Sequence, residues 1–108
     1  MDRVEQVKSF SINLDLPKES GVYEVKQKTA NQERLHIGKA SNLRERILKG
    51  LILGTLPHST GKRIRQGEDV SMLVVRWACT DRKAAVEEEL HLRFKKHFGT
   101  LPEYVKNS

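Results

Sequence analysis

The sequence predicts a small mixed α/β fold of the α+β type, in which helices pack against a small three-stranded antiparallel sheet. Two short runs that alternate with period two are separated by a polar stretch, as in an antiparallel hairpin. Two segments with apolar residues at helical spacing follow, and an apolar run rich in β-branched residues lies between them. With 108 residues, the chain is long enough for one domain with one modest core.

The hairpin comes first among the predicted elements. Residues 21–26 alternate between apolar and polar side chains and predict a half-buried strand. The polar residues 27–33 predict a turn, and residues 34–38 predict the returning strand.

A helix is predicted directly after the hairpin. Ser41 or Asn42 is a suitable N-cap residue, and apolar residues recur at helical spacing behind it. The helix should end within residues 50–54, where two glycines occur. A loop at residues 55–59 then leads to a short basic helix around residues 61–66.

The last third of the chain supplies a central strand and a final helix. Residues 72–79 are rich in β-branched and aromatic side chains, as a central strand requires. Asp81 is placed to cap a helix whose apolar residues recur at spacings of four. Gly99 should end this helix, and residues 101–104 should pack back as a tail.

Composition narrows the class of protein. Residues 1–19 show only weak alternation and contain Pro17, so we expect a loosely held lead-in before a domain at residues 20–108. No run approaches the roughly 18–20 apolar residues of a membrane span, and no signal peptide is apparent. The lone Cys79 allows neither an intramolecular disulfide nor a multi-cysteine zinc site, which favours a cytoplasmic protein.

The charge balance indicates a polyanionic partner. Twenty Lys and Arg residues against fourteen Asp and Glu residues leave a net charge of +6 and a pI near 9.7. Seven of the basic residues fall within one third of the chain: Lys39, Arg44, Arg46, Lys49, Lys62, Arg63 and Arg65. Such clustering favours nucleic acid, although many basic proteins bind none.

The Gly38-Lys39 pair lies between a predicted strand and a predicted helix, as in a nucleotide-binding loop. That motif requires a glycine five residues before the Gly-Lys pair and a Ser or Thr after the lysine. The chain has Glu33 and Ala40 at those positions. A nucleotide-binding loop is therefore excluded.

Two tripeptides and two charged residues occur in a distinctive order. Gly-Val-Tyr occupies residues 21–23, His-Ile-Gly occupies residues 36–38, Arg46 follows ten residues after the histidine, and Glu87 lies in the last predicted helix. Together these elements resemble the GIY-YIG nuclease family, over roughly residues 20–98. One tripeptide is a weak signal, whereas four elements in order are hard to obtain by chance.

The resemblance implies a GIY-YIG-like domain that is a metal-dependent endonuclease cleaving phosphodiester bonds in DNA. Tyr23 and His36 would lie at the attacking water, and Arg46 would bind the scissile phosphate. Glu87 would hold a single Mg²⁺ or Mn²⁺ through its carboxylate, as these hard cations prefer oxygen. The residues expected to contact nucleic acid are Lys39, Asn42, Arg44, His58, Lys62, Arg63 and Arg65.

The chain departs from the family pattern at two positions. His36 occupies the place of the second signature's tyrosine, which leaves the identity of the general base open. A histidine is a competent proton acceptor near its unperturbed pKa of about 6.5. Gly50 stands where many members carry His or Tyr, and we expect His58 from the following loop to replace that side chain.

Each candidate also has an ordinary structural interpretation. Tyr23 alone would be a ring at the edge of a core, and Arg44 and Arg46 alone would be a solvated helix face. Glu87 belongs to an acidic run near a helix N-terminus, where such residues oppose the dipole, and Glu88 is the alternative ligand. His91 alone would be a hydrogen-bonded core histidine.

Other functions remain open from the sequence. The alternative is a non-catalytic nucleic-acid-binding module derived from a nuclease fold, and a further one is a basic subunit that is active only with another protein. A nuclease would act on DNA, including branched or damaged DNA in repair or recombination. Because no DNA-reading domain is appended, specificity would come from a partner protein or from DNA shape.

Overall fold

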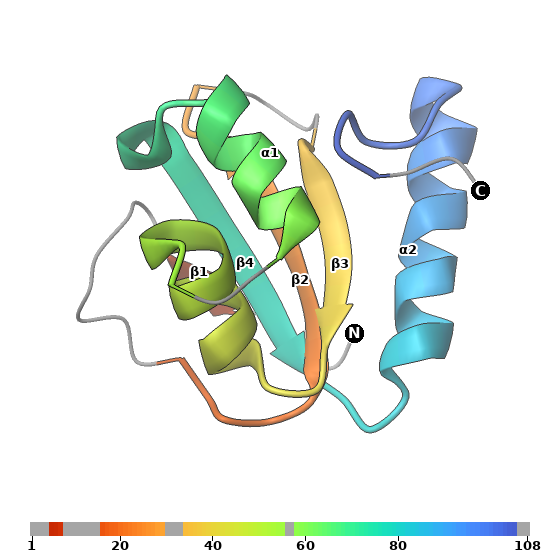
Figure 1. Ribbon diagram of the computed structural model, residues 1–108. Coiled ribbons are helices and arrows are strands. Elements are labelled where there is room, and N and C mark those ends of the chain that lie inside the picture. The colour runs from red at the N-terminus through yellow and green to blue at the C-terminus, as the bar shows by residue number, and fades with distance from the viewer. Residues whose placement is uncertain (1–4, 8–15, 30–33, 56–57, 106–108) are drawn as a thin grey trace.

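The computed structural model describes residues 5–7, 16–29, 34–55 and 58–105. Eight elements follow one another along the chain (Figure 1): strand β1 (Glu5–Val7), strand β2 (Gly21–Gln27), strand β3 (His36–Ala40), π-helix η1 (Glu45–Leu53), helix α1 (Ser59–Gly67), 3₁₀ turn η2 (Val70–Met72), strand β4 (Leu73–Cys79) and helix α2 (Lys83–Phe98). Most of the predicted lead-in, the end of the predicted 27–33 turn and two residues of the predicted loop lie outside the described residues.

The sheet is antiparallel throughout, in the order β1-β4-β2-β3. Tyr23 on β2 pairs with Gly38 on β3 and with Trp77 on β4. The three predicted strands are all present, which confirms the α+β fold class. The expected loose lead-in needs correction, because β1 pairs with β4 as a fourth strand and Leu16 is buried in the core.

One face of the sheet carries the main core. Successive side chains of a strand point to opposite faces, so Tyr23, Val25 and Trp77 lie on the same face. This face packs against buried residues of η1 and α1, including Ile47 and Ile64. In Figure 1, α1 crosses in front of the strands and η1 lies beside it.

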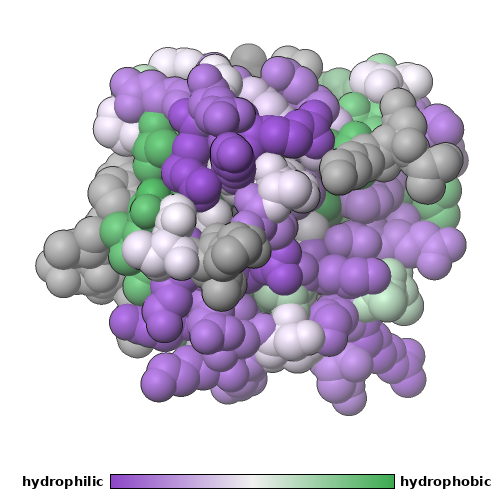
Figure 2. Space-filling model, viewed as in Figure 1, coloured by the Kyte–Doolittle hydropathy of each residue, from purple (hydrophilic) through white to green (hydrophobic). Residues whose placement is uncertain are grey.

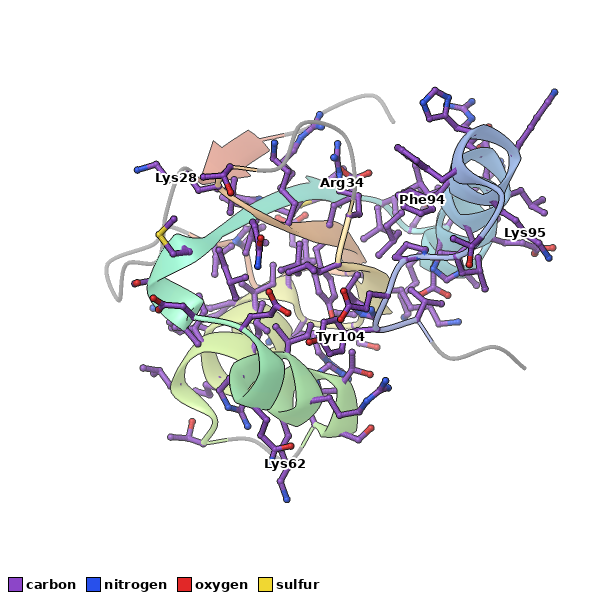
Figure 3. The ribbon with its side chains drawn as sticks, turned by 90° about the horizontal axis from the view of Figure 1, so that it is seen from above. Lys28, Arg34, Lys62, Phe94, Lys95 and Tyr104 are labelled. Carbon is purple, nitrogen blue, oxygen red and sulfur yellow. The ribbon has the colours of Figure 1, made fainter. Side chains whose placement is uncertain are left out.

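The other face is covered by α2. Val22 and Ile37 are buried there, and Phe94 is the buried residue of the helix. In the view from above, Phe94 points from α2 toward the sheet, whereas Lys95 points away from it (Figure 3). Helix α2 lies next to β3, so it covers the part of this face nearest the β3 edge of the sheet (Figure 1). In the described part of the chain, no helix is long and apolar enough to cross a membrane.

Helix ends differ in detail from the sequence-based expectations. Asn42 caps the first helix, since its Oδ1 accepts a hydrogen bond from the backbone N–H of Glu45 at 3.1 Å. That helix is π-helical over most of its length and ends at Gly54, which has a φ of 72°. The predicted Asp81 cap of α2 is wrong, because Arg82 is the N-cap residue and no side chain caps the helix within the described residues. Just before the helix, Thr80 Oγ1 accepts from the N–H of Arg82 at 3.0 Å.

The C-terminal tail packs back as predicted. The N–H of Tyr104 donates to the carbonyl of Leu35, just before β3, at 2.8 Å. The ring of Tyr104 is buried, and its hydroxyl donates to Glu68 Oε2 at 2.9 Å. Helix α2 ends at Gly99, whose φ of 79° is the left-handed conformation that glycine adopts without strain. The tail therefore covers the start of the β3 edge.

Candidate active site

Gly38 is the point where two of the predicted catalytic side chains meet. A Cβ at this position would lie 2.6 Å from Nε2 of His36 and 3.0 Å from Cζ and the hydroxyl oxygen of Tyr23. The two rings have their centroids 5.6 Å apart and are tilted by 58°. The missing side chain of Gly38 therefore makes the space in which the tyrosine hydroxyl and the imidazole come together.

Both rings are held in an environment with little water. Tyr23 is only 2% exposed, and burial raises the pKa of its hydroxyl above the usual value. Burial also lowers the pKa of His36 to about 3, with further lowering by the positive charges of His58, His91 and Arg46 among others. Nδ1 of His36 is buried and has no hydrogen-bond partner among the described residues. Near neutral pH, therefore, Tyr23 is a phenol and His36 is a neutral imidazole.

Arg46 reaches this pair from η1. Its positive charge acts on Tyr23, His36 and His58, lowering the pKa of each. Within the described residues, the guanidinium has no hydrogen bond or ion pair to another side chain. A half-buried guanidinium with its donors unused, next to two uncharged ring groups, is well suited to bind an anion.

His58 lies beside Arg46, as the sequence led us to expect. A Cβ placed on Gly50 would be 3.5 Å from Cβ of His58 and 3.7 Å from Cδ of Arg46. Nδ1 of His58 accepts from the N–H of Gly61 at 3.2 Å and so caps α1. Burial, and then Arg46 and Arg65, lowers the pKa of His58 to about 4. The neutral ring therefore carries its proton on Nε2, which remains available as a donor.

Glu87 approaches from the other side of the sheet, on α2. Its Oε1 lies 3.8 Å from Nζ of Lys39, which comes from β3. The side chain of Glu87 is 20% exposed, and that of Lys39 is 45% exposed. Glu88, the alternative ligand, is exposed, although it lines the same pocket as Glu87. This pocket is also lined by His91.

Charged groups on both faces of the sheet affect Tyr23 near the β3 edge. Tyr23 and His36 lie on the sheet face that η1 and α1 cover, whereas α2 covers the opposite face. Yet the charges of both Arg46 and Glu87 act on the pKa of the Tyr23 hydroxyl, in opposite directions. The Tyr23 hydroxyl therefore lies within the electrostatic influence of charged groups on both faces of the sheet.

The donor set around Glu87 fits a hard divalent cation. One half-buried carboxylate offers oxygen, and the remaining positions are open to water and to a phosphate oxygen, as Mg²⁺ sites commonly require. In the part of the chain that the structure describes, no three His, Cys, Asp or Glu side chains gather into a closed metal cage. A cation at Glu87 would therefore take most of its ligands from water and substrate.

The predicted nucleic-acid contacts separate into two groups. Lys62 and Arg63 are exposed on α1, and Lys62 points away from the sheet (Figure 3). Figure 2 shows hydrophilic side chains over α1 and along α2 on this face. Arg65 instead donates to the carbonyls of Gly50 at 2.6 Å and Leu51 at 3.1 Å, at the end of η1.

Asn42 and Arg44 line a groove at the start of η1, together with Lys18, Glu45 and Lys49. Asn42 also caps that helix. Arg63 lies 5.6 Å from the centroid of the Tyr104 ring.

Two residues of this region were given no functional part by the sequence-based reasoning. Gly38 was read only as part of a signature, and its close approach to the two rings appears only in three dimensions. His91 was interpreted as a core histidine. Its position four residues after Glu87 was the available signal, because side chains at that spacing lie on one helix face.

Comparisons with known proteins identify the fold. No family model and no curated protein matches the chain. The GIY-YIG N-terminal endonuclease domain of UvrC from Thermotoga maritima, bound to its catalytic divalent cation magnesium, is 22% identical with a TM-score of 0.52, covering 86% of this chain and 90% of that one. A point mutant of the same domain, also bound to its catalytic divalent cation, is 26% identical with a TM-score of 0.52, at 87% and 90% coverage.

These neighbours match nearly the whole chain. The match includes the small antiparallel sheet with helices that the sequence predicts. The chain therefore has the fold of a GIY-YIG endonuclease domain.

Proposed function

We propose that this protein is a metal-dependent endonuclease that cleaves phosphodiester bonds in DNA. This proposal rests mainly on the guanidinium of Arg46, which forms no hydrogen bond or ion pair in the described part of the chain. It lies among the uncharged side chains of Tyr23, His36 and His58. Such a group stabilises the negative charge that develops on a phosphate during hydrolysis.

The uncharged groups orient the reacting water. Hydrolysis bonds the water oxygen to phosphorus and breaks the bond to the leaving sugar oxygen, while one proton passes from the water to that oxygen or to solvent. The raised pKa of Tyr23 and the lowered pKa of His36 mean that neither is a strong base near pH 7. We therefore assign them hydrogen bonds to the water and to the phosphate. Nε2–H of His58 is a further donor beside Arg46.

The cation belongs at Glu87. When bound, Mg²⁺ or Mn²⁺ supplies a Lewis acid for a phosphate oxygen. Glu87 holds it from α2, and Lys39 brings a positive charge to the same edge of β3. The similar domain of UvrC is bound to a catalytic divalent cation, which supports a cation for this fold.

The substrate is duplex DNA, including branched or damaged forms. Lys62 and Arg63 on the exposed face of α1 bind its phosphates, and Arg44 and Lys49 extend the positive surface along η1. Phosphate contacts of this kind position the DNA without reading its sequence. We therefore assign specificity to DNA shape or to a partner protein, in a cytoplasmic repair or recombination step.

A nicking assay tests the proposal. Supercoiled plasmid and branched duplexes are incubated with the protein and Mg²⁺, Mn²⁺ or EDTA, and nicked products are quantified. Cleavage should require the cation and should be lost in Glu87→Gln. The matched control is Glu89→Gln, which removes an exposed carboxylate that pairs with Arg93 on the same helix. Glu88→Gln tests the alternative ligand.

The same assay separates the enzyme from a binding module. If DNA binds but no architecture is cut with any cation, the chain is a non-catalytic nucleic-acid-binding module. If Glu88→Gln abolishes cleavage and Glu87→Gln does not, Glu88 is the cation ligand in place of Glu87, and the proposed reaction is unchanged.

A further inference from the structure

Two contacts join α2 to the edge strand β3. Nε2 of His91 lies 2.8 Å from the carbonyl oxygen of Ile37, and Nζ of Lys39 lies 3.8 Å from Oε1 of Glu87. Two residues along a strand span about 6.6 Å, and four residues along a helix span about 6 Å. The matching spacings mean that Glu87 and His91 both face β3.

The contact with Ile37 determines which nitrogen of His91 carries the proton. A carbonyl oxygen can only accept a hydrogen bond, so Nε2 must be the N–H that donates. In the neutral ring, Nδ1 then presents a lone pair. No hydrogen bond to Nδ1 is found within the described residues. Donation of one ring N–H to a backbone carbonyl is also the usual arrangement of a histidine that ligates a metal through its other nitrogen.

His91 lies one helical turn after Glu87, on the same face of α2. Helical side chains lean toward the N-terminus of their helix, so the His91 ring covers the turn that carries Glu87. Both residues, together with Lys39, line one surface pocket between α2 and β3. His91 is half-buried there, which limits the positions its ring can adopt.

We propose that His91 is a second protein ligand, through Nδ1, of the divalent cation held by Glu87. This inference rests on the proposed function only in placing a cation at Glu87. It goes further in naming a nitrogen donor and the hydrogen bond to Ile37 that aims it. The open positions of the cation remain for water and for a phosphate oxygen.

A nitrogen ligand changes which cation the site prefers. Mg²⁺ is bound through oxygen, whereas imidazole nitrogen favours transition metals such as Mn²⁺, Co²⁺ or Zn²⁺. The pair of Glu87 and His91 should therefore bind Mn²⁺ more tightly than Mg²⁺. Without the imidazole, that preference should shrink.

The experiment measures binding of Mn²⁺ and Mg²⁺ alone to the full chain by calorimetry, and records pulsed EPR of bound Mn²⁺. Protein labelled with ¹⁵N-histidine identifies nitrogen coupling from imidazole, which excludes the Lys39 amine. The test variant is His91→Gln, whose amide nitrogen can still donate to the Ile37 carbonyl but which has no Nδ1. Glu87→Gln removes the carboxylate, and His97→Gln removes an exposed histidine of the same helix as a control.

The parent should show histidine nitrogen coupling, and His91→Gln should lose it together with roughly tenfold or more in Mn²⁺ affinity. Mg²⁺ affinity should fall less, and His97→Gln should match the parent. Mn²⁺ binding that depends on Glu87 but shows no histidine coupling would overturn the proposal for His91 and leave the proposed function intact. Absence of any cation binding that depends on Glu87 would overturn both.

Discussion

The two sides of the β3 edge differ in how much water they admit. On the η1 and α1 side, Tyr23 and His36 are buried, and burial is the largest cause of their shifted pKa values. On the α2 side, the side chains of Glu87 and Lys39 are partly exposed and lie 3.8 Å apart as an ion pair. One side thus keeps titratable groups neutral, while the other keeps charged groups accessible.

This difference would suit the two tasks of the proposed hydrolysis. A dry, preorganised side strengthens the interaction of Arg46 with a phosphate, because a low local dielectric increases electrostatic attraction. A cation in the proposed site would have to exchange with solvent, and the partly exposed carboxylate of Glu87 would allow this. Gly38 on the edge strand leaves space beside the Tyr23 hydroxyl, whose pKa is affected by charges from both faces of the sheet.

The largest expected effect comes from removing the charge on the dry side. Arg46→Ala should reduce the cleavage rate by roughly 10²-fold or more, as deletion of a preorganised charge-stabilising donor typically does. DNA affinity and thermal stability should stay close to the parent, because the guanidinium has no bonded partner in the described part of the chain. Single-turnover kinetics on a nicked-plasmid substrate measure the rate. Arg93→Ala, on the exposed surface of α2, is the control, and an equal loss in both variants would remove Arg46 from the site.

The space beside Gly38 can be tested against that beside Gly50. In Gly38→Ala the new Cβ would meet His36 at 2.6 Å, so we expect a loss of about 1–3 kcal/mol in the free energy of unfolding. In Gly50→Ala the Cβ would lie at ordinary distances of 3.5–3.7 Å, and the helix should gain about 0.5–1 kcal/mol. Urea denaturation followed by circular dichroism measures both. Equal stability of the two variants would mean that the rings do not meet over Gly38.

The main helices and strands could be predicted from the sequence, but not every strand pairing and helix cap. The alternation at residues 21–26 and the apolar run at residues 72–79 identify strands whose pairing is confirmed. β1 was missed because three residues carry little periodic signal and their partner β4 lies about seventy positions away. Asp81 was chosen as a cap by residue type, whereas the Thr80 hydroxyl is in position to accept.

The sequence named side chains that the fold brings near one another, but it did not indicate their environment. The order and spacing of Tyr23, Arg46 and Glu87 can be read directly from the sequence. The low pKa of His36 arises from burial and from positive charges on separate elements. The sequence therefore suggested a base with a pKa near neutrality, whereas the structure makes His36 a much weaker base. Nη1 of Arg65, a residue predicted to contact phosphate, likewise donates to two carbonyls of η1, which the sequence did not indicate.

The neutral imidazoles of the dry side should make the protein sensitive to acid. An unfolded histidine binds a proton near pH 6.5, whereas folded His36 and His58 bind one only near pH 3 and 4. Between these values the unfolded state binds more protons, so stability is complete above pH 6.5 and falls as the pH is lowered. Thermal melts at pH 7 and pH 5 measure this loss.

His36→Phe should reduce the acid sensitivity, and it should be as stable as the parent at pH 7 because it removes a buried Nδ1 that lacks a partner. His97→Gln, an exposed change, should keep the parent's dependence on pH. Between pH 5 and 8, the cleavage rates of the parent and of His36→Phe should depend on pH in the same way. If His36→Phe abolished such an inflection, His36 would titrate in the functional range and its side of the site would be wetter than the structure indicates.

The smallest expected effect concerns the exposed cations of α1. The logarithm of DNA affinity should fall linearly with the logarithm of salt concentration, and Lys62→Gln should reduce that slope by about one unit. Arg65→Gln should change the slope less but lower the free energy of unfolding, because two carbonyls of η1 lose their donor. Fluorescence anisotropy with a labelled duplex at several salt concentrations measures the slopes, and urea denaturation measures the stability. If Arg65→Gln flattened the slope as much as Lys62→Gln while leaving stability unchanged, the guanidinium would be binding phosphate rather than holding the end of η1.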